Sequence, residues 1–108
     1  MKTLFDIQAA ICKALSNPKR LEIIYALKDG EHTVSEIVEA VGQRKANVSQ
    51  NLAVLKNAGI LKARRDGLNI HYSIANEKIV TACGLMREFL MEGLEESKTL
   101  LTSLRRVK

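Results

Sequence analysis

The sequence predicts a mainly helical fold with one small β-hairpin, and residues 43–74 supply the two observations behind that prediction. First, residues 45–57 place polar side chains on one side of a helix and apolar side chains on the other. Second, this helix ends at Asn57-Ala58-Gly59, and two short strands follow, LKARR and LNIHYSI, joined at Asp66-Gly67. A polar helix beside a basic hairpin is the arrangement of a winged helix-turn-helix, whose helix can enter the major groove of DNA while the hairpin lies along the phosphates.

Length and charge agree with a single small domain that binds an anionic partner. The chain has 108 residues, and 46% of them are hydrophobic, which is enough for one packed core over 1–108. Lys and Arg number 17 against 12 acidic residues, a formal net charge of +5 that suits nucleic acid. The first residues lack the pattern of a secretory signal, and no window approaches the roughly 20 apolar residues of a membrane span. We therefore expect a cytoplasmic protein whose two cysteines are reduced thiols.

The first two helices are predicted by apolar spacing and by their end signals. Apolar residues recur at helical spacing over residues 3–15. A second helix is expected to begin at Pro18, because Asn17 is a good N-cap and proline suits the first helical position. Gly30 is expected to end it. These two helices precede the polar helix and supply part of the core on which it rests.

A third helix is predicted between a short extended piece and the polar helix. The extended piece is His32-Thr33, and the helix begins at Thr33 or Val34. Gly42 is its C-terminal signal, since glycine adopts the left-handed conformation that commonly ends a helix. The third helix and the polar helix would form the helix-turn-helix, and the hairpin over residues 60–74 would form the wing.

The last predicted helix spans residues 76–105 and is long for a domain of this size. Its apolar positions recur mostly every three or four residues, close to a heptad seam, at 79, 83, 86, 90, 94, 101 and 104. Too little domain remains for such a helix to pack against. We therefore expect it to pair with the helix at 3–15 and with the same elements of a second subunit, giving a homodimer.

The residue types of the polar helix suggest how it would contact DNA. Amide side chains match the paired donor and acceptor of adenine, so Gln50 and Asn47 are the best candidates for contacting bases. Ser49 and Asn51 are expected to anchor the DNA backbone instead. The competing interpretation of the segment is a solvated polar face without a partner.

Basic residues at both ends of this segment are expected to contact phosphates. Arg44 and Lys45 lie at the start of the polar helix, where phosphate binding is favourable. Arg64 and Arg65 precede the hairpin turn on opposite faces of a strand, so only one of them can point at DNA from the strand itself. The complete set of predicted DNA-contacting residues is Arg44, Lys45, Asn47, Ser49, Gln50, Asn51, Lys56, Arg64, Arg65, Asn69 and His71.

Three motifs give the chain a resemblance to the ArsR/SmtB family of repressors. ALSNPKRLEII over residues 14–24 resembles the family's entry into its second helix. VSQNLAVLKNAGIL over 48–61 resembles its recognition helix, and RRDG at 64–67 followed by HYSI at 71–74 resembles its wing. The resemblance covers about residues 8–90, and it implies a homodimer that represses transcription and releases DNA when an inducer binds.

The metal sites of that family are not matched here. Thr33-Val34-Ser35 stands where one site has a Cys-x-Cys pair, and neither hydroxyl residue replaces a soft thiolate. A second site uses Asp, His, His and Glu on the last helix, where this chain has Asn76, Lys78, Phe89 and Glu92. The only histidines, His32 and His71, have no ligand partner at metal spacing. We therefore expect neither a bound metal nor a cofactor.

The two cysteines leave two interpretations open. Cys12 on the first helix and Cys83 on the last could be small core residues, because free cysteine is commonly buried. They could instead form a thiol pair that responds to an oxidant, reactive sulfur or a soft metal and shifts the two helices. Family sensors of this kind have a cysteine in the second helix, where this chain has Ile23-Ile24-Tyr25, so the hypothesis rests on helix geometry. The pair could form within a subunit or across the dimer.

Other classes of function find less support in the sequence. An enzyme would need a constellation such as Ser/His/Asp or paired carboxylates, and there is also no glycine-rich phosphate loop. A regulator or chromatin-type protein without an inducer remains the main alternative. A protein–protein module built on the last helix is a further one, and a steep salt dependence of DNA affinity would exclude it.

Overall fold

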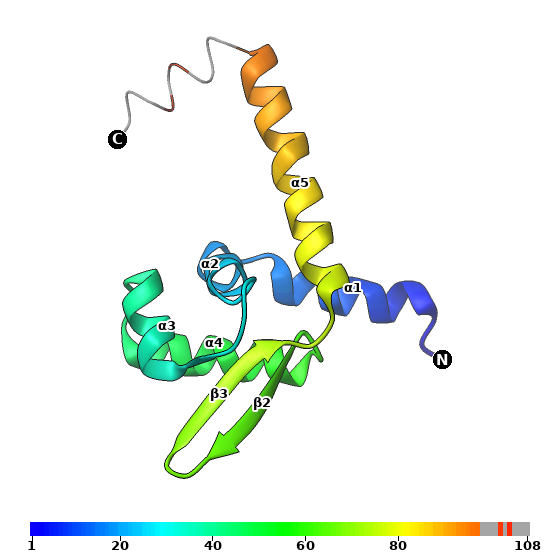
Figure 1. Cartoon of the computed structure of the whole chain (residues 1–108). Helices are drawn as coiled ribbons and strands as arrows, with labels where there is room; N and C mark the ends of the chain where they lie inside the picture. The colour runs from blue at the N-terminus through cyan, green and yellow to red at the C-terminus, as the bar shows by residue number, and fades with distance from the viewer. Residues whose placement is uncertain (98–101, 103, 105–108) are drawn as a thin grey trace.

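The computed structural model describes residues 1–97 together with Thr102 and Leu104. Along this part of the chain, helices and strands follow the predicted order (Figure 1). Their bounds are α1 Leu4–Leu15, α2 Pro18–Ala26, β1 His32–Thr33, α3 Val34–Val41, α4 Lys45–Asn57, β2 Leu61–Asp66, β3 Asn69–Ile74 and α5 Glu77–Glu96. The β2–β3 hairpin projects from the helical body, and α5 extends away from it on another side (Figure 1). The predicted mainly helical fold with a hairpin wing is confirmed.

Local end signals start α2 and α3 and end α3 where the sequence predicts. The prediction that Gly30 ends α2 is wrong, because α2 ends at Ala26 with Leu27 as its C-cap. The Asn17 side chain accepts two backbone N–H groups of the first turn of α2, at 2.9 and 3.1 Å. Thr33 and Glu36 cap α3 reciprocally, each side chain accepting the other residue's backbone N–H, at 3.2 and 2.8 Å. Gly42 ends α3 with φ of 65°, a left-handed conformation that glycine adopts without strain. These caps fix where α3 stops and therefore where the turn into α4 begins.

The last helix differs from its prediction. α5 ends at Glu96, and Ser97 has left the helical region with φ of −105° and ψ of 77°. The prediction of one unbroken helix to residue 105 is therefore wrong at Ser97, where a serine can exchange helical hydrogen bonds for its own side-chain bonds. Of the predicted continuation, residues 98–101, 103 and 105 lie outside the described residues.

The core is built from the inner faces of α2, α3 and α4 and the base of the hairpin. Val48, Leu52 and Leu55 of α4 are fully buried against it. Its other buried members are Ala14, Ile23, Ile24, Leu27, Ile37, Ile60, Leu61 and Ile74. Since α4 commits one whole face to this core, its opposite face is held outward in a fixed orientation.

The sheet has three antiparallel strands in the order β1-β3-β2. Leu61 pairs with Ile74 at the base of the hairpin, and Arg64 pairs with His71 farther out. β1 adds Thr33 opposite His71 on the other edge of β3. The extended piece predicted at 32–33 is thus a strand of the sheet. Strand alternation then divides the wing into one face that continues from the core and one polar outer face.

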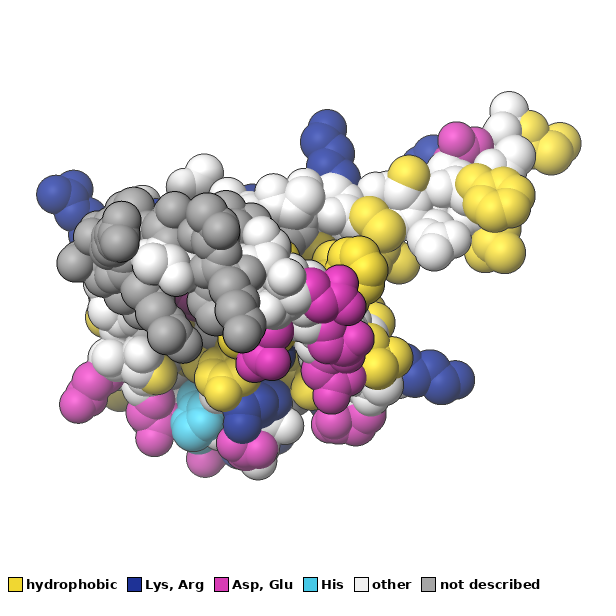
Figure 2. Space-filling model, turned by 90° about the horizontal axis from the view of Figure 1, so that it is seen from above, with side chains coloured by type: hydrophobic (Ala, Val, Ile, Leu, Met, Phe, Trp, Pro, Cys, Tyr) yellow, Lys and Arg dark blue, Asp and Glu magenta, His cyan; other side chains and the backbone are white. Residues whose placement is uncertain are grey.

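Apolar side chains are left uncovered on the two terminal helices. The largest of them are Leu4, Phe5 and Ile7 on α1 and Leu85, Met86, Phe89, Leu90 and Met91 on α5. Figure 2 shows hydrophobic side chains gathered along the projecting arm that α1 forms. Within one chain α1 packs against α2 and α4, whereas α5 packs mainly against β3. The expected pairing of α1 with α5 is therefore not an extensive contact of a single subunit, and it stays a prediction for the dimer.

Candidate nucleic-acid interface

The outer face of α4 presents the polar residues that the sequence singles out. Arg44, Lys45, Asn47, Ser49 and Gln50 are all exposed. They lie opposite the fully buried apolar face of the same helix. Arg44 occupies the N-cap position but makes no side-chain cap hydrogen bond, so its guanidinium is not used to end the helix. The first two turns of α4 therefore offer amides, a hydroxyl and two cations to a partner.

Asn51 differs from the other polar residues of α4 because it has a partner inside the protein. It is half-buried, and its side-chain oxygen accepts a hydrogen bond of 3.5 Å from Arg20 Nη1. Arg20 Nε also donates to the backbone carbonyl of Ala14 at 2.7 Å. Arg20 thus links the end of α1, the first turn of α2 and the middle of α4. This contact could not be predicted from local sequence patterns, because the two side chains are 31 residues apart.

Gln43 is a second residue that sequence reasoning missed. Its side chain is only 8% exposed, and its Nε2 donates to the Lys19 carbonyl at 3.2 Å. The contact ties the turn between α3 and α4 to the start of α2. Its Oε1 is buried without a hydrogen-bond partner in the described part of the chain. A polar residue at a turn is ordinarily expected in solvent, so only the three-dimensional packing reveals this role.

The outer face of the wing carries an ion-pair cluster. Arg64 Nη2 and Nε donate to the two carboxylate oxygens of Glu31 at 2.5 and 3.3 Å. Arg64 Nη1 also lies 3.9 Å from Asp66. His71 lies between the two acids, with Nδ1 3.9 Å from Glu31 and Nε2 4.0 Å from Asp66. The hydrogen bond from Arg64 holds the pKa of Glu31 below its usual value, so this carboxylate is charged at neutral pH.

The other predicted DNA-contacting residues of the wing and of α4 make no ion pair within the described part of the chain. Arg65 pairs with Ile70 in the ladder, which places it on the opposite face from Arg64, as predicted. Among the described residues Arg65 makes no ion pair, and Asn69 and Lys56 are exposed. Of the two wing arginines, Arg65 is therefore the one whose charge is not already engaged by a carboxylate.

The cysteines lie outside the core of the subunit. Cys12 is exposed on α1, and Cys83 is partly buried on α5. The interpretation of both as core residues is therefore wrong for a single chain, because Cys12 is exposed and Cys83 is only partly buried. Burial raises the pKa of the Cys83 thiol, which lowers its thiolate fraction at neutral pH. No three His, Cys, Asp or Glu side chains within the described ranges are arranged to hold a metal ion.

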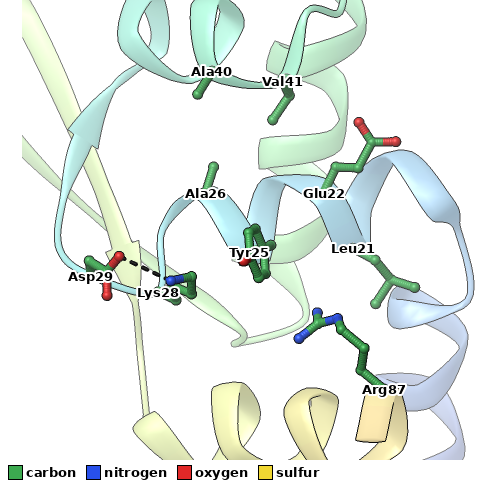
Figure 3. A pocket seen from close by; sticks show the side chains of 9 residues that line it. All are labelled: Leu21, Glu22, Tyr25, Ala26, Lys28, Asp29, Ala40, Val41 and Arg87. Carbon is green, nitrogen blue, oxygen red and sulfur yellow. Dashed lines mark hydrogen bonds and ion pairs between the residues drawn. The ribbon is translucent and has the colours of Figure 1, made fainter. Parts of the chain in front are cut away.

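A groove of about 710 Å³ lies where α5 passes the helical body (Figure 3). The Tyr25 ring projects into it from α2, with Lys28 Nζ 4.8 Å and Arg87 Cζ 4.9 Å from the ring centroid. Glu22 and Asp29 also line it, so acidic and basic groups balance and favour no ligand of one charge. The Tyr25–Arg87 contact joins α5 to α2. No described helix is long and apolar enough to cross a membrane.

Comparison with known proteins agrees with this geometry. A family model described as a bacterial regulatory protein of the arsR family matches residues 17–63, from α2 into the hairpin. An uncharacterized HTH-type transcriptional regulator of Mycobacterium tuberculosis is 35% identical over 103 residues, covering 94% of this chain and 90% of the relative. A probable mercury resistance operon repressor of Streptomyces lividans is 34% identical over 82 residues, covering 76% of this chain and 66% of the relative.

Solved structures show the same fold. The crystal structure of the M. tuberculosis regulator Rv0081 has a TM-score of 0.78 and 34% identity, covering 90% of this chain and 98% of that one. A homodimeric winged helix-turn-helix DNA-binding domain from Mycobacterium bovis has a TM-score of 0.79 and 38% identity, covering 86% of each chain. Taken with the polar face of α4 and the wing, these matches show that the chain belongs to the ArsR family of transcriptional regulators, which are DNA-binding proteins and not enzymes.

Proposed function

We propose that the chain acts in the cytoplasm as a homodimeric repressor that binds double-stranded operator DNA. One observation carries this proposal: α4 buries one face completely and presents amides, a hydroxyl and cations on the other. That orientation lets the helix enter a major groove while its inner face stays in the core. The wing would lie against the flanking phosphates. Two relatives named as repressors, a probable mercury resistance operon repressor and a biofilm growth-associated repressor, support repression as the outcome.

The homodimer follows from the apolar surface of the terminal helices. A single winged helix contacts only one DNA half-site, and two half-sites one helical turn apart need two copies of α4 held about 34 Å apart. The exposed apolar residues of α1 and α5 are the surface available for that pairing. The homodimeric relative from M. bovis supports this arrangement.

Release by an inducer through Cys12 and Cys83 is the finer part of the proposal. The two thiols lie on the helices that would form the dimer platform, so a disulfide or a bridging sulfur between them would move that platform. A disulfide needs α-carbons roughly 4.4–6.8 Å apart. Since α1 and α5 make no extensive contact within one chain, we expect the two cysteines to approach across the dimer.

One observation favours the alternative of a regulator without a thiol inducer. Thiol chemistry proceeds through the thiolate, and burial raises the pKa of Cys83, which lowers the fraction of thiolate at neutral pH. Comparison of the unchanged protein with a Cys12→Ser, Cys83→Ser protein separates the two candidates. Under the thiol proposal, oxidant lowers the DNA affinity of the unchanged protein and leaves that of the double variant unaltered. Under the alternative, oxidant alters the DNA affinity of neither protein.

The test of DNA binding uses fluorescence anisotropy with the DNA upstream of the protein's own coding sequence. Gln50→Ala should lower affinity for that sequence by about 1–3 kcal/mol, while random DNA loses much less, because an amide contact to a base is specific. Lys45→Gln should weaken binding to both DNAs alike and reduce the salt slope by about 1. Equal affinity of the unchanged protein for both DNAs, with Gln50→Ala without effect, would contradict sequence-specific binding through α4.

A further inference from the structure

A carboxylate next to the wing is paired with one of the predicted DNA-contacting cations of the wing. β3 is the central strand of the sheet, with β1 on one edge and β2 on the other. Arg64 lies on β2, and Glu31 immediately precedes β1. The Arg64 side chain therefore reaches across the outer face of β3 to meet Glu31, 33 residues away in sequence. This contact spans the full width of the sheet and is not one between neighbours along a strand.

The geometry of the contact makes it stronger than a single surface ion pair. Both carboxylate oxygens of Glu31 are occupied, by Nη2 and Nε of the same guanidinium. A two-point arginine–carboxylate pair is charge-assisted in both bonds and fixes the orientation of the guanidinium. Asp66 at 3.9 Å adds a second acid on the same cation. A DNA phosphate that approaches Arg64 must therefore displace a partner already in place.

Arg65 provides the internal contrast. It is the next residue on the same strand, is exposed and makes no ion pair among the described residues. A phosphate can approach it without breaking a protein contact. The two adjacent arginines have the same charge but lie on opposite faces of the strand, and only Arg64 is held by a carboxylate.

We propose that Glu31 restrains Arg64 and thereby limits the affinity of the wing for DNA. The proposal rests on the proposed function, because it concerns how strongly the same DNA-binding surface binds. With Glu31 in place, Arg64 contributes little to binding the phosphate backbone. Without it, Arg64 is released as a further phosphate ligand. Glu31 is therefore a residue that sets affinity from outside the recognition helix, and sequence patterns along α4 do not reveal it.

The experiment is a double-mutant cycle measured by anisotropy on the same upstream DNA over a range of salt concentrations. Glu31→Gln keeps the size of the side chain and removes its charge. Solvent screens even a two-point ion pair when it is exposed, so we expect affinity to rise by only about two- to fivefold at low salt. The slope of log K against log salt should steepen by about 0.9, the value for one more phosphate contact.

The cycle separates release of Arg64 from a general loss of negative charge. In an Arg64→Gln background Glu31→Gln should change affinity by less than about 1.5-fold, since the restrained cation is gone. In an Arg65→Gln background, the matched control, the two- to fivefold gain should persist. Equal gains in all three backgrounds would overturn the proposal in favour of bulk electrostatics. A loss of affinity on Glu31→Gln would overturn it by making the pair a support for the wing.

Failure of the proposed function gives a different result from failure of this inference. If the unchanged protein does not bind the DNA, the whole function is wrong, and the cycle has no starting point. If it binds and its salt slope does not change with Glu31→Gln, only the restraint by Glu31 is wrong. Circular dichroism melts of each variant confirm that folding is unchanged, as expected for substitutions at exposed positions.

Discussion

Phe89 offers the sharpest test of how the chain assembles. Its side chain is 78% exposed on α5, in the middle of the apolar surface that one subunit leaves uncovered. A buried phenylalanine removes about 150–250 Å² from water, so roughly 120–200 Å² of this ring is still available for burial. At about 25 cal/mol per Å² this is roughly 3–5 kcal/mol per subunit as an upper limit. A two-fold interface contains the residue twice.

Part of that free energy is absorbed by the costs of association. Taking about 3 kcal/mol for both copies together, Phe89→Ala should weaken the dimer by roughly 150-fold in Kd. Sedimentation equilibrium measures this directly. Leu68→Ala is the matched control, because Leu68 is fully exposed at the tip of the hairpin, away from both terminal helices, and should leave the dimer unchanged. An unchanged dimerisation constant for Phe89→Ala would refute the assignment of this face of α5 to the interface.

Three further predictions concern the subunit itself. Leu52→Ala removes a fully buried side chain beneath the exposed polar face of α4 and should lower the free energy of unfolding in urea by about 2–5 kcal/mol. A loss below about 1 kcal/mol would mean that α4 is not anchored as described. In a Cys12→Ser background, Cys83 should react with iodoacetamide more slowly at pH 8 in the folded protein than in urea, because burial raises its pKa; equal rates would contradict this. The pKa values of Asp6 and Glu36 are lowered by the backbone N–H groups they accept as helix caps. The charged carboxylates therefore stabilise the fold fully above pH 3.8 for Asp6 and pH 4.5 for Glu36, their ordinary pKa values. This stabilisation is lost as the pH falls through the lowered pKa values. Glu36→Gln should therefore flatten the acid side of a plot of stability against pH.

Local sequence patterns were sufficient for the elements and for the orientation of α4. The cap at Asn17, the left-handed Gly42 and the alternation of Val48, Leu52 and Leu55 with polar residues are all interactions within a few positions. Such patterns reflect the backbone geometry of one helix or turn, so they can be recognised without knowing the rest of the fold. The same kind of pattern predicts the end of α5 wrongly, because a heptad-like spacing continues past Ser97 although the helix does not.

The partners of individual side chains could not be predicted in that way. Arg20 meets Asn51 from 31 residues away, and Arg64 meets Glu31 from 33 residues away, so neither pair leaves a periodic trace. Only the order of strands β1-β3-β2 brings Glu31 to the face that carries Arg64. A sequence with the same elements and a different strand order would have left Arg64 without Glu31, its partner across the sheet.

These internal contacts change how the net positive charge of the chain should be interpreted. A net charge of +5 predicts attraction to DNA, but it counts every cation alike. In the folded chain Arg20 is turned inward to Ala14 and Asn51, Arg64 is held by Glu31, and Arg65 is engaged by no carboxylate in the described residues. The charge available to a phosphate is therefore set by tertiary contacts as well as by composition. For this fold, we expect DNA affinity to follow the number of cations without an internal partner, and we expect Glu31→Gln to raise affinity by loosening the hold on Arg64.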